Sequence, residues 1–128
     1  MMKFISGEQG FTLLELIAVL VILSILAAIA IPRYISVDES ARQRAIDAGI
    51  AELNGREILT WSNMKIDSAG YIDDPTLFSS LSTTLGNDYR WQGGSPTRNG
   101  GTLGFKESTL VPLIRTESTF EKPGYWSK

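Results

Sequence analysis

The chain has 128 residues and a mass of 14.1 kDa, with 12 basic and 14 acidic side chains. This length allows one small domain and excludes a second independent core. The formal net charge is −2, so the chain lacks the excess of Lys and Arg that sequence-independent nucleic-acid binding needs. No nucleic-acid partner is therefore expected. With no Cys and no His, disulfides, the usual zinc sites and Cys–His or Ser–His–Asp nucleophile systems are excluded, which predicts that the protein is not an enzyme.

The first ten residues form a short polar segment that includes Lys3 and leads directly into an apolar segment. This arrangement is typical of a targeting leader. We therefore treat residues 1–10 as a leader peptide, separate from the folded protein.

Residues 11–31 form a strongly apolar run, in which 18 of the 21 residues are apolar. A helix of this length reaches roughly 30 Å at 1.5 Å per residue, about the hydrocarbon thickness of a bilayer. A buried core helix is the alternative, but a domain this small has little other apolar material to surround a helix that is apolar on every face. Basic residues flank both ends, Lys3 before and Arg33 after, and favour a cytoplasmic N-terminus only weakly.

Two of the three polar residues in this run need a physical reason. Ser24 can return its hydroxyl to a backbone carbonyl one turn back. Glu15 is more costly, because an ionised carboxylate in a bilayer costs about 2.5 to 3.5 kcal/mol and should have a partner. The local alternative is that Glu15 complements the dipole at the start of its own helix.

Beyond the apolar run, Pro32 should kink or loosen the helix, because proline lacks an amide hydrogen and disfavours helical backbone at the residue before it. The helix is predicted to resume over residues 37–64, where apolar residues recur at helical spacing. The surface pairs available to it are Glu39 with Arg42 and Glu52 with Arg56. One apolar side consists of Val37, Ala41, Ala45, Ala48, Gly55 and Leu59, and the nearly opposite side of Ile46, Ile50, Leu53 and Met64. One side could pack on the protein's own head and the other on another subunit, although a single domain covering both sides fits the periodicity equally well.

After Met64 the sequence changes to short runs broken by Gly, Ser, Asn and Pro, which indicates a small mixed domain. The Asp74-Pro75 pair predicts a helix start, and Gly86 a stop, for a short helix over residues 75–85. Three strands are predicted over residues 89–92, 102–106 and 110–115, forming a three-stranded antiparallel sheet. We expect Tyr125 and Trp126 to anchor the C-terminus on the sheet or the helix. The predicted fold class is α+β, a long N-terminal helix packed on a small antiparallel sheet.

The stretch Gly10-Phe11-Thr12-Leu13-Leu14-Glu15, followed by the apolar run to Pro32, resembles the processing and assembly signal of type IV pilins and pseudopilins. The resemblance covers the first 35 or so residues well, the long helix in outline, and the head only in size and order of elements. It implies a type IV pilin-like fold. It also implies that a membrane-embedded prepilin peptidase cuts after Gly10 and methylates the new amine of Phe11.

The same resemblance implies roles for further residues. Glu15, with Thr12, is expected to act in assembly, where the carboxylate neutralises the terminal amine of a neighbouring subunit, and a buried charge is tolerable when it is paired. Pro32 is expected to mark where the helix loosens inside the fibre. Many pilin heads close their C-terminal loop with a disulfide, which this chain cannot form, so something else must hold residues 110–128.

Some relatives use calcium for that purpose, so we considered four carboxylates as ligands: Asp73, Asp74, Asp88 and Glu107. Their spacing fits no EF-hand loop, and solvated surface carboxylates are the preferred interpretation. No cofactor is therefore predicted, with calcium kept as an open alternative.

The sequence thus predicts a leader (1–10), a transmembrane and assembly helix (11–35), a helix continuing into the head (36–64) and a small globular head (65–128). As a family member, the protein would be a structural pilin, a homo-oligomer in a helical filament, with the prepilin peptidase, an inner-membrane assembly platform and membrane lipid as partners. The precursor would cross the inner membrane once with a periplasmic head, and the assembled filament would be extracellular. A type II secretion pseudopilin is the close alternative. A minor tip subunit that binds a surface or DNA through the 93–101 loop, with Arg90 and Arg98, is the alternative of another class.

Overall fold

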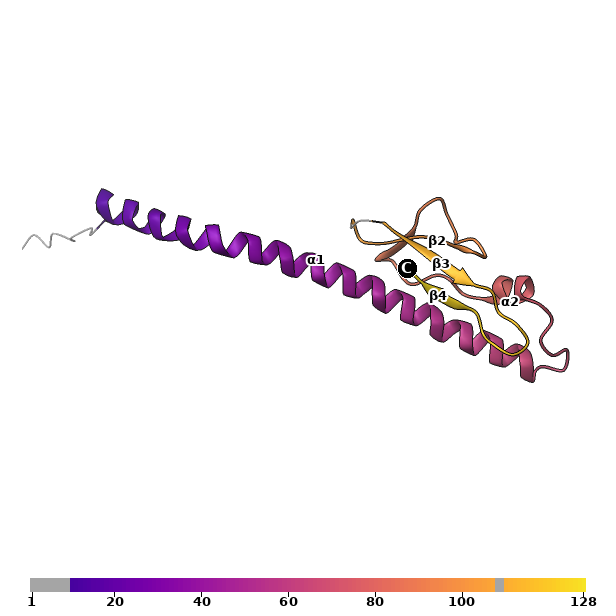
Figure 1. Ribbon diagram of the computed structural model, residues 1–128. Helices are drawn as coiled ribbons and strands as arrows, with labels where there is room; N and C mark the ends of the chain where they lie inside the picture. The colour runs from indigo at the N-terminus through magenta and orange to yellow at the C-terminus, as the bar shows by residue number, and fades with distance from the viewer. Residues whose placement is uncertain (1–9, 108–109) are drawn as a thin grey trace, which may run out of the picture. The chain divides into compact units, whose positions relative to one another are not determined.

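The computed structural model describes residues 10–107 and 110–128. It divides into two compact units, Met1–Glu39 and Ser40–Lys128. The described helices are α1 (Leu13–Ile66) and α2 (Asp74–Ser80), and the strands are β1 (Tyr89–Trp91), β2 (Gly100–Phe105), β3 (Val111–Thr116) and β4 (Tyr125–Ser127). The second unit, in which residues 40–66 of α1 pack on the sheet (Figure 1), confirms the predicted α+β fold.

The sheet has four antiparallel strands in the order β1-β2-β3-β4. The three predicted strands are present, but the prediction of a three-stranded sheet was wrong because the C-terminal residues add β4 to the free edge of β3. Trp126 is fully buried while Tyr125 is exposed, which is the alternation of a strand with one covered face. The short run after Pro123 and Gly124 was too brief to indicate a strand by itself.

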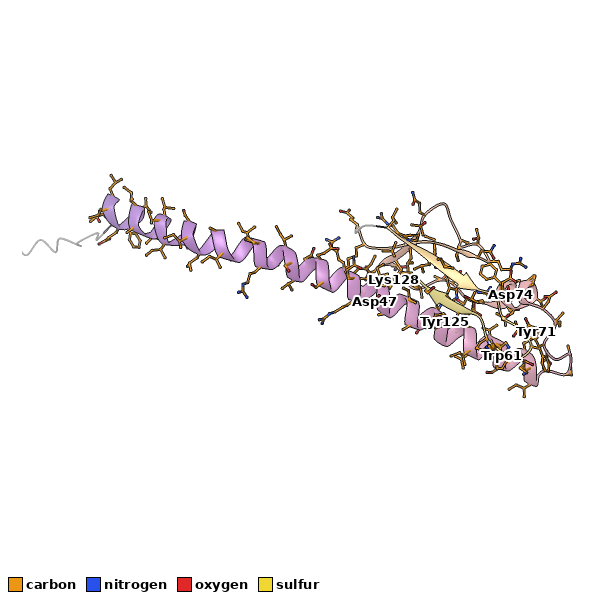
Figure 2. The ribbon with its side chains drawn as sticks, viewed as in Figure 1. Asp47, Trp61, Tyr71, Asp74, Tyr125 and Lys128 are labelled. Carbon is orange, nitrogen blue, oxygen red and sulfur yellow. The ribbon has the colours of Figure 1, made fainter. Side chains whose placement is uncertain are left out.

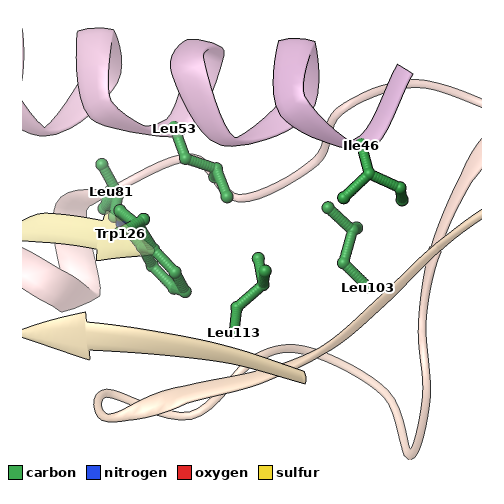
Figure 3. Packing of buried hydrophobic residues seen from close by; sticks show 6 residues of the cluster. All are labelled: Ile46, Leu53, Leu81, Leu103, Leu113 and Trp126. Carbon is green, nitrogen blue, oxygen red and sulfur yellow. The ribbon is translucent and has the colours of Figure 1, made fainter. Parts of the chain in front are cut away.

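The hydrophobic core of the head lies between α1 and the inner face of the sheet (Figure 3). It consists of Ile46 and Leu53 from α1, Leu81 after α2, Leu103 and Leu113 from the sheet, and Trp126. The Ile46 side of α1 is therefore the side that covers the head. On the opposite side Leu59 is 64% exposed, so among the described residues one domain does not cover both sides.

The short helix begins near its predicted start and ends earlier than predicted. Asp73 caps it by accepting a hydrogen bond from the backbone amide of Thr76 at 2.8 Å, with Pro75 in the first turn. The helix ends at Ser80, not at residue 85. The hydroxyls of Ser79 and Ser80 both donate to the carbonyl of Thr76, at 2.7 and 3.2 Å. Such local hydrogen bonds compete with helix formation, and more Ser and Thr follow.

Candidate functional site

The N-terminal segment of the described chain begins with a reciprocally capped helix start. The backbone amide of Glu15 donates to the hydroxyl of Thr12 at 3.2 Å, and the amide of Thr12 donates to the carboxylate of Glu15 at 3.3 Å. This is a capping box, which satisfies two amides that the helix itself leaves unpaired. Thr12 and Glu15 therefore lie together at the start of α1, where the amide of Thr12 gives the carboxylate one exposed local hydrogen bond.

Just before this cap, Gly10 and Phe11 lie open to solvent. A side chain at Gly10 would meet nothing within 4 Å, and Phe11 is 86% exposed. Neither residue contributes to packing within the described chain.

The apolar side chains that follow are exposed on every face of α1. The large ones between Leu13 and Ile31 are 49% to 77% exposed, and none of the most apolar 18-residue window is buried. This is the one helix among the described residues that is long and apolar enough to cross a membrane. Ser24 donates to the carbonyl of Leu20 at 2.7 Å, which is the predicted bond to the preceding turn.

Pro32 lies within α1, with helical backbone on both sides. Its missing amide hydrogen leaves the carbonyl one turn earlier without its usual helical donor. Loosening of the helix at Pro32 inside a fibre stays a prediction.

A buried charge cluster joins the elements of the head. The guanidinium of Arg115 donates to the carboxylate of Glu57, from Nε to Oε1 and from Nη2 to Oε2 at 3.3 Å. It also donates to Asp74, from Nη1 at 3.0 Å and Nη2 at 2.8 Å. The side chains of Arg115 and Glu57 are fully buried, and that of Asp74 is 6% exposed. Trp126 Nε1 donates to Glu57 at 3.0 Å, and the amide and hydroxyl of Ser118 each donate to Asp74 at 2.7 Å.

Arg98 adds a second positive charge at the edge of this cluster. Glu57 and Asp74 together have one negative charge more than Arg115 neutralises, and Arg98 Nε lies 3.9 Å from Asp74. Arg98 also pairs with Glu117 at 3.2 Å. In the described chain no buried side-chain nitrogen or oxygen lacks a hydrogen-bond partner. The cluster is therefore satisfied, as a buried ion pair must be to be tolerated.

The cluster also determines the ionisation of its members. Burial alone would raise the pKa of Asp74, but the hydrogen bonds from Arg115 and Ser118 outweigh burial and hold this pKa below its usual value. Burial alone would lower the pKa of Arg115, but its bonds to Asp74 and Glu57 raise it. Both groups are therefore charged throughout the physiological pH range.

Further contacts hold the C-terminal residues against α1. Asn54 bonds both backbone groups of Trp126, accepting from its amide at 2.7 Å and donating to its carbonyl at 3.1 Å. Trp61 Nε1 donates to the carbonyl of Thr119 at 2.8 Å, and Lys65 to that of Phe120 at 2.9 Å. At the end of the chain, Lys128 pairs with Asp47 of α1 (Figure 2). These contacts and the charge cluster hold residues 110–128 without a disulfide.

The interpretation of Asp74 as a solvated surface carboxylate was wrong, because Arg115 and Ser118 bind both of its oxygens. The structure does not bring the four considered carboxylates together. Over residues 10–107 and 110–128, no group of three potential ligands is placed to hold a metal ion. The pairing predicted between Glu52 and Arg56 is confirmed at 2.9 Å.

Sequence reasoning missed Glu57 and Arg115, although each left a signal. Glu57 lies four residues after Leu53 on the side of α1 that faces the sheet, and Arg115 lies two residues after Leu113 on the inner face of β3. A charged residue at the next core position of an apolar pattern indicates a buried partner. Glu57 and Arg115 are two such residues of opposite charge, so the sequence could have indicated that they pair.

One comparison with known proteins concerns the N-terminal segment. Residues 5–31 match the family model described as the prokaryotic N-terminal methylation motif. The chain is 49% identical over 43 residues to the type IV narrow pilus major component PilA5 of Thermus thermophilus. That alignment covers 34% of this chain and 37% of the relative, so the chain spans little more than a third of the relative's length. No solved structure matches the chain.

The matched motif includes the helix start at Thr12 and the exposed apolar side chains that follow it. The relative is a pilus component. On this agreement, the chain resembles type IV pilins, and its N-terminal methylation motif carries the resemblance.

Proposed function

We propose that the protein is a structural subunit of a type IV pilus-like filament, which polymerises through its N-terminal apolar helix. The single observation that supports this best is the exposure of every large apolar side chain between Leu13 and Ile31. Burial of apolar surface stabilises by about 25 cal/mol per Å², so a segment this exposed requires either lipid or other protein around it. Lipid would surround the segment in a membrane-held precursor, and other subunits would surround it in an assembled filament.

The proposed sequence of events begins in the inner membrane, where the precursor is anchored once with its head in the periplasm. The prepilin peptidase cuts between Gly10 and Phe11 and methylates the new amine. The accessible junction supports this step, because a glycine with open space around it lets a protease approach the backbone. An assembly platform in the membrane then transfers the subunit into an extracellular filament.

Glu15 has a specific part in this proposal. In the unprocessed chain its carboxylate accepts from the amide of Thr12 across an exposed contact of 3.3 Å. Cleavage would place a positively charged amine four residues away from it, on Phe11. We propose that the carboxylate pairs with the corresponding amine of a neighbouring subunit, which makes its burial in the filament tolerable.

The head adds a second surface suited to subunit contact. On the side of α1 away from the core, Ala41, Ala48, Gly55 and Leu59 form an exposed strip of small or apolar residues, with Arg44 and Glu52 at its edges. A helix face that only meets water normally has charged residues. This face supports contact with another subunit.

The test is the intact mass and N-terminal sequence of the protein from sheared extracellular filaments and from membranes. Chains beginning at N-methylated Phe11 in the sheared fraction are the expected result. Processed chains confined to membranes would indicate the pseudopilin alternative. Chains still beginning at Met1, in cells with an active prepilin peptidase, would contradict the proposal.

A tip subunit that binds DNA through the 93–101 loop has less support. Arg98, one of its two basic residues, pairs with Asp74 and Glu117, and its carbonyl accepts from Arg115 at 3.2 Å. A guanidinium used in this way is less available to phosphate groups. The observations therefore favour the structural subunit.

A further inference from the structure

The apolar character of α1 does not end where the membrane-spanning run ends. Ile35 and Val37 follow Pro32 and are 62% and 68% exposed. Apolar content alone would therefore allow the helix to enter a bilayer by one further turn. Something else must determine which residue lies at the bilayer surface.

Arg33 and Tyr34 lie between the apolar run and these two residues. Both are exposed, Tyr34 at 75%. They are the residues suited to a lipid headgroup layer, because tyrosine is amphipathic and enriched at membrane interfaces. The guanidinium of arginine binds phosphate oxygens in pairs.

Their position also matches the thickness of a bilayer. The capped start at Thr12 and Glu15 lies 18 residues before Arg33 when counted from Glu15, which is roughly 27 Å of helix. This distance is close to the hydrocarbon thickness of about 30 Å. The polar helix start and the Arg33–Tyr34 pair would therefore lie at opposite surfaces of one bilayer.

We infer that Arg33 and Tyr34 form an interfacial anchor that binds lipid headgroup phosphates and sets the depth of the precursor in the membrane. The inference rests on the proposed membrane-held precursor. It assigns to these two residues a function that the apolar run does not provide. Without them, Ile35 and Val37 would enter the hydrocarbon region.

The absence of cysteine from the chain allows a direct depth measurement. The full-length precursor would be reconstituted in vesicles of phosphatidylcholine and phosphatidylglycerol, with a nitroxide label on a single introduced cysteine. Ser36→Cys reports the position next to the anchor, and Ile22→Cys reports the middle of the apolar run. Accessibility of each label to oxygen and to a water-soluble nickel chelate gives its depth.

The variant to compare combines Arg33→Gln with Tyr34→Ser, and the matched control is Arg44→Gln, an exposed arginine farther along α1. We expect the Ser36 label at headgroup level in the native and control chains. In the double variant it should move inward by about one helical turn, roughly 5 Å. An unchanged depth in the double variant, or a water-exposed Ser36 label with the native anchor, would overturn the inference.

The Ile22 label separates this result from the proposed function. If the Ile22 label lies in hydrocarbon while the Ser36 label does not respond, the anchor is wrong and the membrane-held precursor stands. If the Ile22 label itself lies in water, the membrane-held precursor is wrong and the anchor is wrong with it.

Discussion

Apolar side chains are usually buried and charged side chains usually exposed, and each unit of this chain departs from one half of this rule. The first unit exposes apolar side chains from Phe11 to Ile31, whereas the head buries the charged side chains of Glu57, Asp74 and Arg115. In the described part of the head every buried charged side chain has its hydrogen-bond partners within the chain, so this cluster needs no other subunit. The apolar helix has no such partners among the described residues, so its surface is explained only by lipid or other subunits. Removing an internal partner should therefore damage the head alone, and changing the apolar surface should damage anchoring and assembly alone.

The largest effect on the head is expected from Arg115→Leu. This change leaves two buried carboxylates without their cation, which should cost about 3 to 5 kcal/mol. Urea unfolding of the full chain in detergent, followed by tryptophan fluorescence, measures the cost because Trp126 lies beside Glu57. Arg44→Leu is the exposed control and should change the free energy of unfolding by less than about 0.5 kcal/mol. Equal effects of the two substitutions would show that the cluster does not stabilise the head.

The matching change in the apolar helix is Leu20→Asp. A carboxylate in the middle of a bilayer costs about 2.5 to 3.5 kcal/mol on insertion scales, so the fraction of precursor in the membrane should fall. The urea midpoint of the head should stay at its native value, because Leu20 belongs to the other unit. Membrane fractionation and unfolding of the same variant check both statements. A large loss of head stability would contradict the separation of the two units.

A smaller effect distinguishes two glycines of α1. A side-chain carbon at Gly49 would lie 2.9 Å from Tyr89 Cε1 and 3.3 Å from Leu85, whereas one at Gly55 would meet nothing within 4 Å. Gly49→Ala should therefore destabilise the head by about 1 to 3 kcal/mol through overpacking. Gly55→Ala should stabilise the head by about 0.5 to 1 kcal/mol, because alanine lowers the conformational entropy of the unfolded chain. Thermal unfolding of both variants should show shifts of opposite sign, and shifts of the same sign would contradict the packing.

The smallest expected effect is the pH dependence of the native head. Asp74 has a native pKa below its ordinary value of 3.8, so its contribution to stability is present above about pH 3.8 and is lost as the pH falls through the lower native value. Thermal unfolding should therefore show no loss from Asp74 between pH 7 and 5 and a decline below pH 4. In the Arg115→Leu variant, stability should instead rise on acidification below pH 7, since protonation relieves the unpaired buried carboxylates. An acid-induced decline already between pH 7 and 5 in the native chain would contradict the assignment of Asp74.

Much of this fold could be predicted because its signals are local. The apolar run, the helix start at Asp74 and Pro75, and the strands β1, β2 and β3 are indicated by neighbouring residues. The strand formed by Tyr125, Trp126 and Ser127 could not be predicted so easily, because it exists only through pairing with β3 and the hydrogen bonds of Asn54. Tertiary contacts of this kind leave little trace in a three-residue segment.

The N-terminal motif and the buried charge cluster of the head also differ in how local their sequence signals are. Gly10, Phe11, Thr12 and Glu15 are adjacent in sequence, so their arrangement could be read directly from the motif. Glu57 and Arg115 are 58 residues apart, and their pairing depends on how α1 lies across the sheet. Their charges on the apolar faces indicated burial, but only the folded structure identifies each partner.

The most direct test of the account is the amount of filament sheared from cells that produce Glu15→Ala, compared with the native chain and Glu52→Ala. Glu52 is an exposed glutamate on the same helix that pairs locally with Arg56, so its loss controls for removal of a carboxylate as such. We predict that Glu15→Ala removes the filaments, that Glu52→Ala retains them, and that the thermal unfolding of the head is unchanged in Glu15→Ala. Native amounts of filament from Glu15→Ala would contradict assembly through the N-terminal segment.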